Sequence, residues 1–93
     1  MPDRIHAVMT LAVIGLGVWT GLNLVEWAIL ALAVGGVWAA EGLNTALEEL
    51  ADHLHPDHHR AIGRVKDIAA AGVLLMAVAS AVAGLLVFWP HWF

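Results

Sequence analysis

The sequence predicts an all-α membrane protein with three transmembrane helices. Of its 93 residues, 61% are apolar and 13% are charged, whereas about 25% of the residues in a soluble domain are charged. Uncharged runs long enough to cross a hydrocarbon core recur along the chain, and short polar segments separate them. This length allows a single transmembrane domain, residues 1–93, without a separate soluble catalytic domain. Any catalytic site must therefore be built from the spans.

The first predicted span covers about residues 5–22. Residues 7–25 carry no charged side chain, and a helix rising about 1.5 Å per residue over this length matches the thickness of a hydrocarbon core. A cleaved signal peptide is the alternative, since Arg4 precedes the apolar run, but no small-x-small cleavage site follows it. The next residues predict a tight turn, because Asn23 can cap a second helix and Glu26 can complete a capping box.

The second predicted span covers about residues 24–53 and has two unlike halves. Residues 27–40 are uncharged, whereas the half that follows is rich in acids. We expect the helix to stop at His55, because the residue before Pro56 is disfavoured in the α-helical conformation. A cytoplasmic loop at about residues 54–60 then leads to the next span.

The third predicted span covers about residues 59–89. Its first turns carry basic residues, and residues 68–93 contain no formal charge. We expect Pro90 to end this helix, because proline lacks the backbone N–H that a helix interior uses.

The distribution of basic residues predicts the topology. Every Lys and Arg lies either at Arg4 or within residues 60–66, so the positive-inside rule places the N-terminus and the 53–66 loop in the cytoplasm. Tryptophans at the other ends of the spans form the expected aromatic belt of the opposite interface: Trp19, Trp27, Trp89 and Trp92. We interpret His6 and His91 as interfacial side chains that reach towards water.

A polar stripe in the second span requires a functional explanation, because ionisable residues inside a span are costly. This acidic stripe consists of Glu41, Asn44, Glu48 and Asp52. At about 100° per residue its members lie within about 80° of one another, whereas Glu49 points away. Carboxylates that share a face repel one another or bind cations, and their hard oxygens suit Mg²⁺, which usually arrives with nucleotide phosphates.

The third span supplies a counter-charge for the acidic stripe. Lys66 is expected at the membrane level of Asp52, and Asp67 follows it directly. Carboxylates for a metal, a base and a lysine for phosphate are the parts that phosphoryl transfer requires. The alternative is an ion-pair network that only joins the helices, although three acids against one lysine pair poorly.

Small residues indicate where helices approach closely. Gly17 and Gly21 form a GxxxG motif, and Ser80 and Gly84 form a similar pair. Three helices of this length bury little surface, so we expect a homo-oligomer. The sequence lacks a basic patch for nucleic acid, and we expect no nucleic-acid partner.

Several segments together resemble the prokaryotic diacylglycerol kinase family, which includes the undecaprenol kinases. They are EGLNTALE at 41–48, PDHH at 56–59 and KDIAAAGVLL at 66–75, with Asp52 between them and RIH and LVEW near the first turn. The resemblance covers nearly the whole chain. It implies a homotrimeric kinase of the bacterial inner membrane, with active sites between subunits at the cytoplasmic interface. Such an enzyme transfers the γ-phosphate of Mg-ATP to a lipid alcohol, diacylglycerol or undecaprenol.

The resemblance also implies roles for individual residues. Glu41 is similar to the general base that takes the proton of the lipid hydroxyl, and Asn44 to its positioning partner. Glu48 corresponds to the residue that holds Mg²⁺ on the nucleotide phosphates. Lys66 would neutralise the γ-phosphate, and Asp67 would orient the lysine or the nucleotide.

The chain departs from the family pattern at its N-terminus. The family has a further surface helix there, with an acid whose position would fall before Met1. Asp3 lies on the same side of a helix as that position and is the candidate to replace the acid as a metal ligand. An ordinary solvated acid is the alternative.

A histidine-rich segment near the second loop is a weaker candidate metal site. Its members are His53, His55, His58 and His59. Imidazole nitrogens suit Zn²⁺ and similar metals, but adventitious binding or solvated loop residues explain the cluster better, because it lacks the fixed ligand spacing of a known site. The competing function is a non-catalytic membrane oligomer, either a relative that binds lipid without turnover or a small metal or ion carrier.

Overall fold

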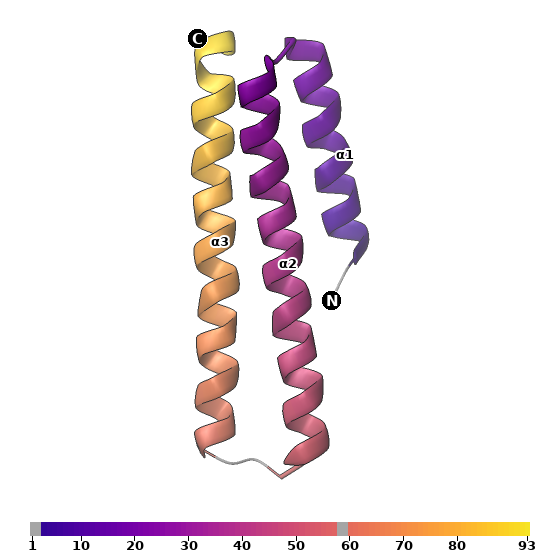
Figure 1. Ribbon diagram of the computed structural model, residues 1–93, viewed down its shortest axis with the longest axis vertical. Coiled ribbons are helices and arrows are strands. Elements are labelled where there is room, and N and C mark those ends of the chain that lie inside the picture. The colour runs from indigo at the N-terminus through magenta and orange to yellow at the C-terminus, as the bar shows by residue number, and fades with distance from the viewer. Residues whose placement is uncertain (1–2, 58–59) are drawn as a thin grey trace.

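The computed structural model describes residues 3–57 and 60–93, apart from the side chain of Asp3. In these ranges the chain forms three antiparallel helices and no strand, as Figure 1 shows. They are α1 (Asp3–Thr20), α2 (Leu24–Leu54) and α3 (Arg60–Trp92). The all-α fold class is therefore confirmed.

The α1–α2 turn has the predicted capping box. The Asn23 side chain accepts a hydrogen bond from the Glu26 backbone N–H at 2.9 Å, and the Glu26 carboxylate accepts one from the Asn23 N–H at 3.1 Å. Helix α1 ends at Thr20, slightly before the expected end of the span at residue 22. The reason is Gly21, whose φ of +79° lies in the left-handed region that glycine adopts without steric cost and that terminates helices.

The expected stop at Pro90 is wrong, because α3 continues to Trp92. A proline in the last turn removes a single backbone donor, and the Phe93 N–H still donates to the Trp89 carbonyl at 2.9 Å. Tertiary contacts also hold this turn: the Trp92 indole N–H donates to Thr20 Oγ1 at 3.0 Å. Packing against the α1–α2 end of the molecule therefore outweighs the local preference of proline.

His91 contacts another helix and is not simply an interfacial side chain that reaches towards water. Its Nε2 lies 2.7 Å from a carboxylate oxygen of Glu26, so the side chain is tied to the first turn of α2. The Trp19 and Trp92 rings meet edge to face nearby, with centroids 6.2 Å apart. These contacts join the C-terminal end of α3 to the α1–α2 turn, where Figure 1 also places the C-terminus.

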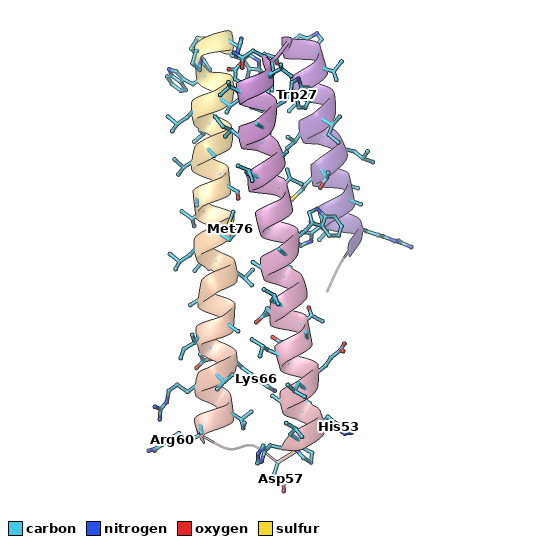
Figure 2. The ribbon with its side chains drawn as sticks, in the orientation of Figure 1. Trp27, His53, Asp57, Arg60, Lys66 and Met76 are labelled. Carbon is cyan, nitrogen blue, oxygen red and sulfur yellow. The ribbon has the colours of Figure 1, made fainter. Side chains whose placement is uncertain are left out.

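The α2–α3 pair is the main packing unit. The Ser80 hydroxyl donates to the Ala33 carbonyl at 3.0 Å, which requires the two helices to lie close together. Gly36 of α2 leaves the space that the Met76 side chain of α3 fills (Figure 2). Near the top of the molecule, Gly17 of α1 similarly faces the Trp27 ring. Gly17 and Ser80 therefore lie at close helix contacts as predicted, whereas a Cβ added at Gly21 or Gly84, the other members of the two predicted pairs, would meet nothing within 4 Å.

Helix α1 covers only part of α2. Figure 1 shows α1 beside only the upper part of α2, so the ends of α2 and α3 near Leu54 and Arg60 extend beyond α1. Two helices, α2 and α3, are long and apolar enough to cross a membrane, and the apolar helix at Arg4–Thr20 is shorter. Most large apolar side chains are exposed on the single chain, and the described residues buried as core are Leu30, Ala33, Ala51 and Val87. Lipid or other copies of the chain can therefore cover these faces.

Candidate functional site

The acidic stripe runs along the lower half of α2. Glu41 and Asn44 are half-buried, whereas Glu48 and Asp52 are exposed. The Asn44 Nδ2 donates a hydrogen bond to Glu48 Oε1 at 3.2 Å, a contact that residues one turn apart on a helix can make. The Asn44 amide therefore restrains the Glu48 carboxylate.

Glu41 faces α1. One carboxylate oxygen of Glu41 lies 3.8 Å from His6 Nε2, and the two side chains are only 20% and 16% exposed. The interfacial interpretation of His6 is thus corrected, because the imidazole lies against an acid between two helices. No spacing rule connects residues 6 and 41, so sequence reasoning missed this contact.

Asp52 faces α3. Lys66 Nζ donates to Asp52 Oδ1 at 2.5 Å, with the side chains 35% and 65% exposed. Figure 2 shows Lys66 pointing from α3 towards α2. The two residues therefore lie at the same level, as expected. A pair this exposed contributes little to stability, about 0–1 kcal/mol, because water screens it.

Asp67 lies on a different part of α3 from Lys66. Together with Arg60, Gly63 and Arg64 it lines an open surface depression. A rotation of about 100° per residue separates adjacent side chains on a helix, which explains the divergence. Within one chain, the structure thus does not bring Lys66 and Asp67 to a common point.

The stripe extends along the helix axis. Glu41 and Asp52 are separated by about 16 Å, from eleven residues at about 1.5 Å each. One chain therefore places Glu41 beside α1 and Lys66 beside the far end of the stripe.

Asn44 and Glu48 offer oxygen atoms of the kind that Mg²⁺ prefers. The Oδ1 atom of Asn44 is buried and has no hydrogen-bond partner, although most buried polar atoms have one. The Nδ2 end of the same amide contacts the Glu48 carboxylate, so an amide and a carboxylate that both carry hard oxygens lie one turn apart on α2. Mg²⁺ commonly takes one or two protein oxygens and completes its shell with water and phosphate. The donor set fits this ion in its nucleotide-bound form.

The alternative metal sites receive no support from the described part of the chain. Within residues 3–57 and 60–93, no three His, Cys, Asp or Glu side chains form a metal-binding group. His53 and His55 are exposed, and His58 and His59 lie outside the described residues. The side chain of Asp3, the candidate further metal ligand, also lies outside them.

Comparison with known proteins identifies the relationship. The profile described as "Prokaryotic diacylglycerol kinase" matches residues 3–88, which is almost all of the chain. The chain belongs to the prokaryotic diacylglycerol kinase family. This membership makes it a helical membrane protein and a lipid kinase.

Two relatives within the kinase family illustrate the similarity. The chain is 39% identical over 87 residues to the undecaprenol kinase of Bacillus subtilis, an alignment that covers 94% of this chain and 71% of that protein. It is 26% identical over 88 residues to the diacylglycerol kinase of Escherichia coli K12, covering 95% of this chain and 72% of the relative. A kinase of this family uses a nucleotide as its phosphate donor and a membrane lipid as its acceptor.

Proposed function

We propose that this chain transfers the γ-phosphate of Mg-ATP to a lipid alcohol, undecaprenol or diacylglycerol, at the cytoplasmic interface of the bacterial inner membrane. Family membership supports the reaction class. The higher identity to the relative named undecaprenol kinase favours undecaprenol as the first acceptor to test. The observation that carries the residue assignment is the acidic stripe, whose side chains meet a histidine at one end and a lysine at the other.

The half-buried Glu41 is the general base in this proposal. A carboxylate screened from water keeps its position and accepts the proton of the lipid hydroxyl as that oxygen attacks the γ-phosphorus. Asn44 positions the reacting groups, because its restrained amide lies one turn from Glu41 and already contacts Glu48.

Glu48 and the free Oδ1 of Asn44 are the oxygens that would hold Mg²⁺ on the nucleotide. When bound, Mg²⁺ supplies charge neutralisation at the transferring phosphate. Lys66 leaves its exposed partner Asp52 and donates to a γ-phosphate oxygen, because a phosphate carries more negative charge than one carboxylate. Asp67, on the adjacent face of α3, orients the nucleotide.

We propose a homotrimer with active sites between subunits. Phosphoryl transfer requires a base, a metal and a cation at one phosphorus atom, whereas one chain holds Lys66 of α3 beside Asp52, eleven residues along α2 from Glu41. A neighbouring subunit can bring its Lys66 to the Glu41 of the first subunit. The exposed apolar faces provide area for such contacts.

The topology follows from the charges. The end of the bundle that carries Arg60, Arg64 and Lys66 lies in the cytoplasm, and α1, α2 and α3 all cross the membrane. The acidic stripe then lies near the leaflet where ATP is present.

The test is transfer of labelled γ-phosphate from Mg-ATP to undecaprenol and, separately, to diacylglycerol, by the purified chain in detergent or lipid. We expect label in the phosphorylated lipid, dependent on Mg²⁺. Glu41→Gln is the matched inactive control, because it preserves shape and removes the base; we expect a loss of about 100-fold or more. Transfer to neither lipid by a well-formed oligomer would contradict the proposal.

A further inference from the structure

His6 is held in place at the side of α2 that carries Glu41. Its imidazole packs edge to face on the Trp38 ring, with centroids 5.4 Å apart and an interplanar angle of 65°. Trp38 lies about one turn before Glu41 on the same helix. The ring contact therefore sets both the distance and the direction of His6 relative to the carboxylate.

A short chain of hydrogen bonds fixes the same contact. The Trp38 indole N–H donates to Thr10 Oγ1 at 3.0 Å, and the Thr10 hydroxyl donates to the His6 carbonyl at 2.7 Å. Side-chain networks of this kind restrict rotamers and hold the backbones together. Contacts from both α1 and α2 therefore hold His6 in position.

The imidazole has unused hydrogen-bonding capacity. Its Nδ1 is buried and lacks a partner within the described residues. Nε2 faces Glu41 at 3.8 Å, which is within ion-pair range but longer than a hydrogen bond. In the part of the chain that the structure describes, His6 is also the one basic side chain within ion-pair distance of Glu41.

We propose that His6 is the proton acceptor that returns Glu41 to its ionised form in each catalytic cycle. This inference rests on the proposed function, because it needs Glu41 to be the general base. A base beside a protonated carboxyl gives the proton a direct acceptor. His6 is such a base, and within the described residues no other basic side chain lies within ion-pair distance of Glu41.

The lipid O–H bond breaks as its oxygen bonds to the γ-phosphorus, the bond from that phosphorus to the bridging oxygen breaks, and ADP leaves with the electron pair. The proton goes to Glu41. The side chain of Glu41 closes to hydrogen-bond length, as catalytic contacts do in substrate complexes. The proton then moves to Nε2, and the imidazolium releases it to water near the exposed Arg4.

His6→Phe tests the proposal because phenylalanine keeps a ring against Trp38 and removes both nitrogens. We expect kcat for lipid phosphorylation to fall by about tenfold or more, with KM for ATP and for the lipid unchanged. Ile5→Phe is the matched control, because it adds the same side chain at an exposed neighbouring position. It should leave kcat unchanged.

His6→Ala supplies a second readout that a packing role would not move. Added imidazole should restore part of its kcat, and should not restore that of Glu41→Gln. A His6→Phe enzyme within twofold of the unaltered chain would overturn the inference. The inference would also be overturned if kcat in the His6 variants fell in parallel with the melting temperature and added imidazole did not restore it.

The two failures are distinguishable. If the unaltered chain transfers no phosphate, the proposed function fails and this inference fails with it. If the unaltered chain is active and the His6 variants match it, only the role of His6 is wrong.

Discussion

Glu48 and Glu49 are adjacent acids on α2 with different surroundings. Glu48 accepts a hydrogen bond from Asn44 and shares its face, whereas Glu49 is exposed and lies about 100° further round the helix. Chemical type alone does not distinguish them. Their positions on the helix do, because only one can meet a nucleotide held along the stripe.

We therefore expect Glu48→Gln to lower kcat/KM for lipid phosphorylation by about 100-fold or more, because the Mg²⁺-bound phosphates lose a charged ligand. Glu49→Gln is the matched control and should stay within about threefold of the unaltered chain. Steady-state kinetics over a range of Mg²⁺ concentrations measures both. Equal losses in the two variants would show that net charge near the membrane matters rather than the stripe.

Substitution of Lys66 distinguishes a catalytic role of this lysine from a structural one. Its pair with Asp52 is partly exposed, so Lys66→Met should change the melting temperature in detergent by only a few degrees. Phosphoryl transfer should fall far more, since the phosphate loses its cation. Asp52→Asn breaks the same pair and leaves the lysine, and its melting temperature serves as the comparison. A large loss of stability in Lys66→Met would favour the network that only joins helices.

At the scale of the element, α1 is attached to α2 by close packing as well as by the turn. A Cβ added at Gly17 would lie 2.5 Å from the Trp27 ring, while one added at Gly15 meets nothing within 4 Å. An aromatic ring cannot yield as a flexible side chain does. We expect Gly17→Ala to destabilise the protein by about 1–3 kcal/mol, and Gly15→Ala to be neutral or slightly stabilising. Thermal unfolding in detergent checks both, and equal melting temperatures would contradict the packing.

The first turn of α2 contains an acid, Glu26, that makes the stability of the folded protein depend on pH. Glu26 lies before the uncharged segment 27–40, outside the apolar part of the helix. The hydrogen bond from the Asn23 backbone N–H, and then the contact with His91, lower the pKa of Glu26. A carboxyl whose pKa is lower when folded stabilises the protein above its ordinary pKa and loses that contribution as pH falls through the lowered value.

We accordingly expect the unaltered chain to melt at a higher temperature than Glu26→Gln near neutral pH. The difference should shrink as the pH falls below the ordinary range of glutamate, because the carboxyl then becomes protonated in the folded state. Melting curves from neutral pH down to about pH 3 measure the difference. A constant difference across this range would contradict the assignment, and Glu49→Gln provides an exposed acid for comparison.

At the scale of the whole molecule, one chain does not bring Glu41 and Lys66 together, although the proposed function needs both at one phosphate. Its large apolar side chains are mostly exposed, and its candidate catalytic residues are spread over α2 and the first turns of α3. A membrane can cover an apolar face but cannot bring a lysine to a distant acid. Association with further copies can do both.

Mixing two inactive variants tests that association. Glu41→Gln and Lys66→Met chains, combined in detergent and reassembled, should regain phosphoryl transfer if a site uses residues from different subunits. Some mixed sites would then contain both intact side chains. Each variant reassembled alone is the control. Activity that stays at background in well-mixed oligomers would place Glu41 and Lys66 in the same subunit's site.

Much of the candidate site could be predicted from the sequence because it depends on helical periodicity. A rotation of about 100° per residue brings Glu41, Asn44 and Glu48 to one face regardless of the partner helix. The capping box at Asn23 and Glu26 is local in the same way. The level shared by Lys66 and Asp52 follows from a short connection between two antiparallel helices.

The sequence by itself determined the helical class, the membrane setting, the kinase family and the residues of the acidic stripe. Only the tertiary structure decided that His6 meets Glu41, that His91 meets Glu26, and that α3 continues past Pro90. The physical reason is the range of the interactions. Periodicity, capping and hydropathy act within about one helical turn or along one segment. Pairs separated by tens of residues depend on how the helices are packed against one another, and no local rule contains that information.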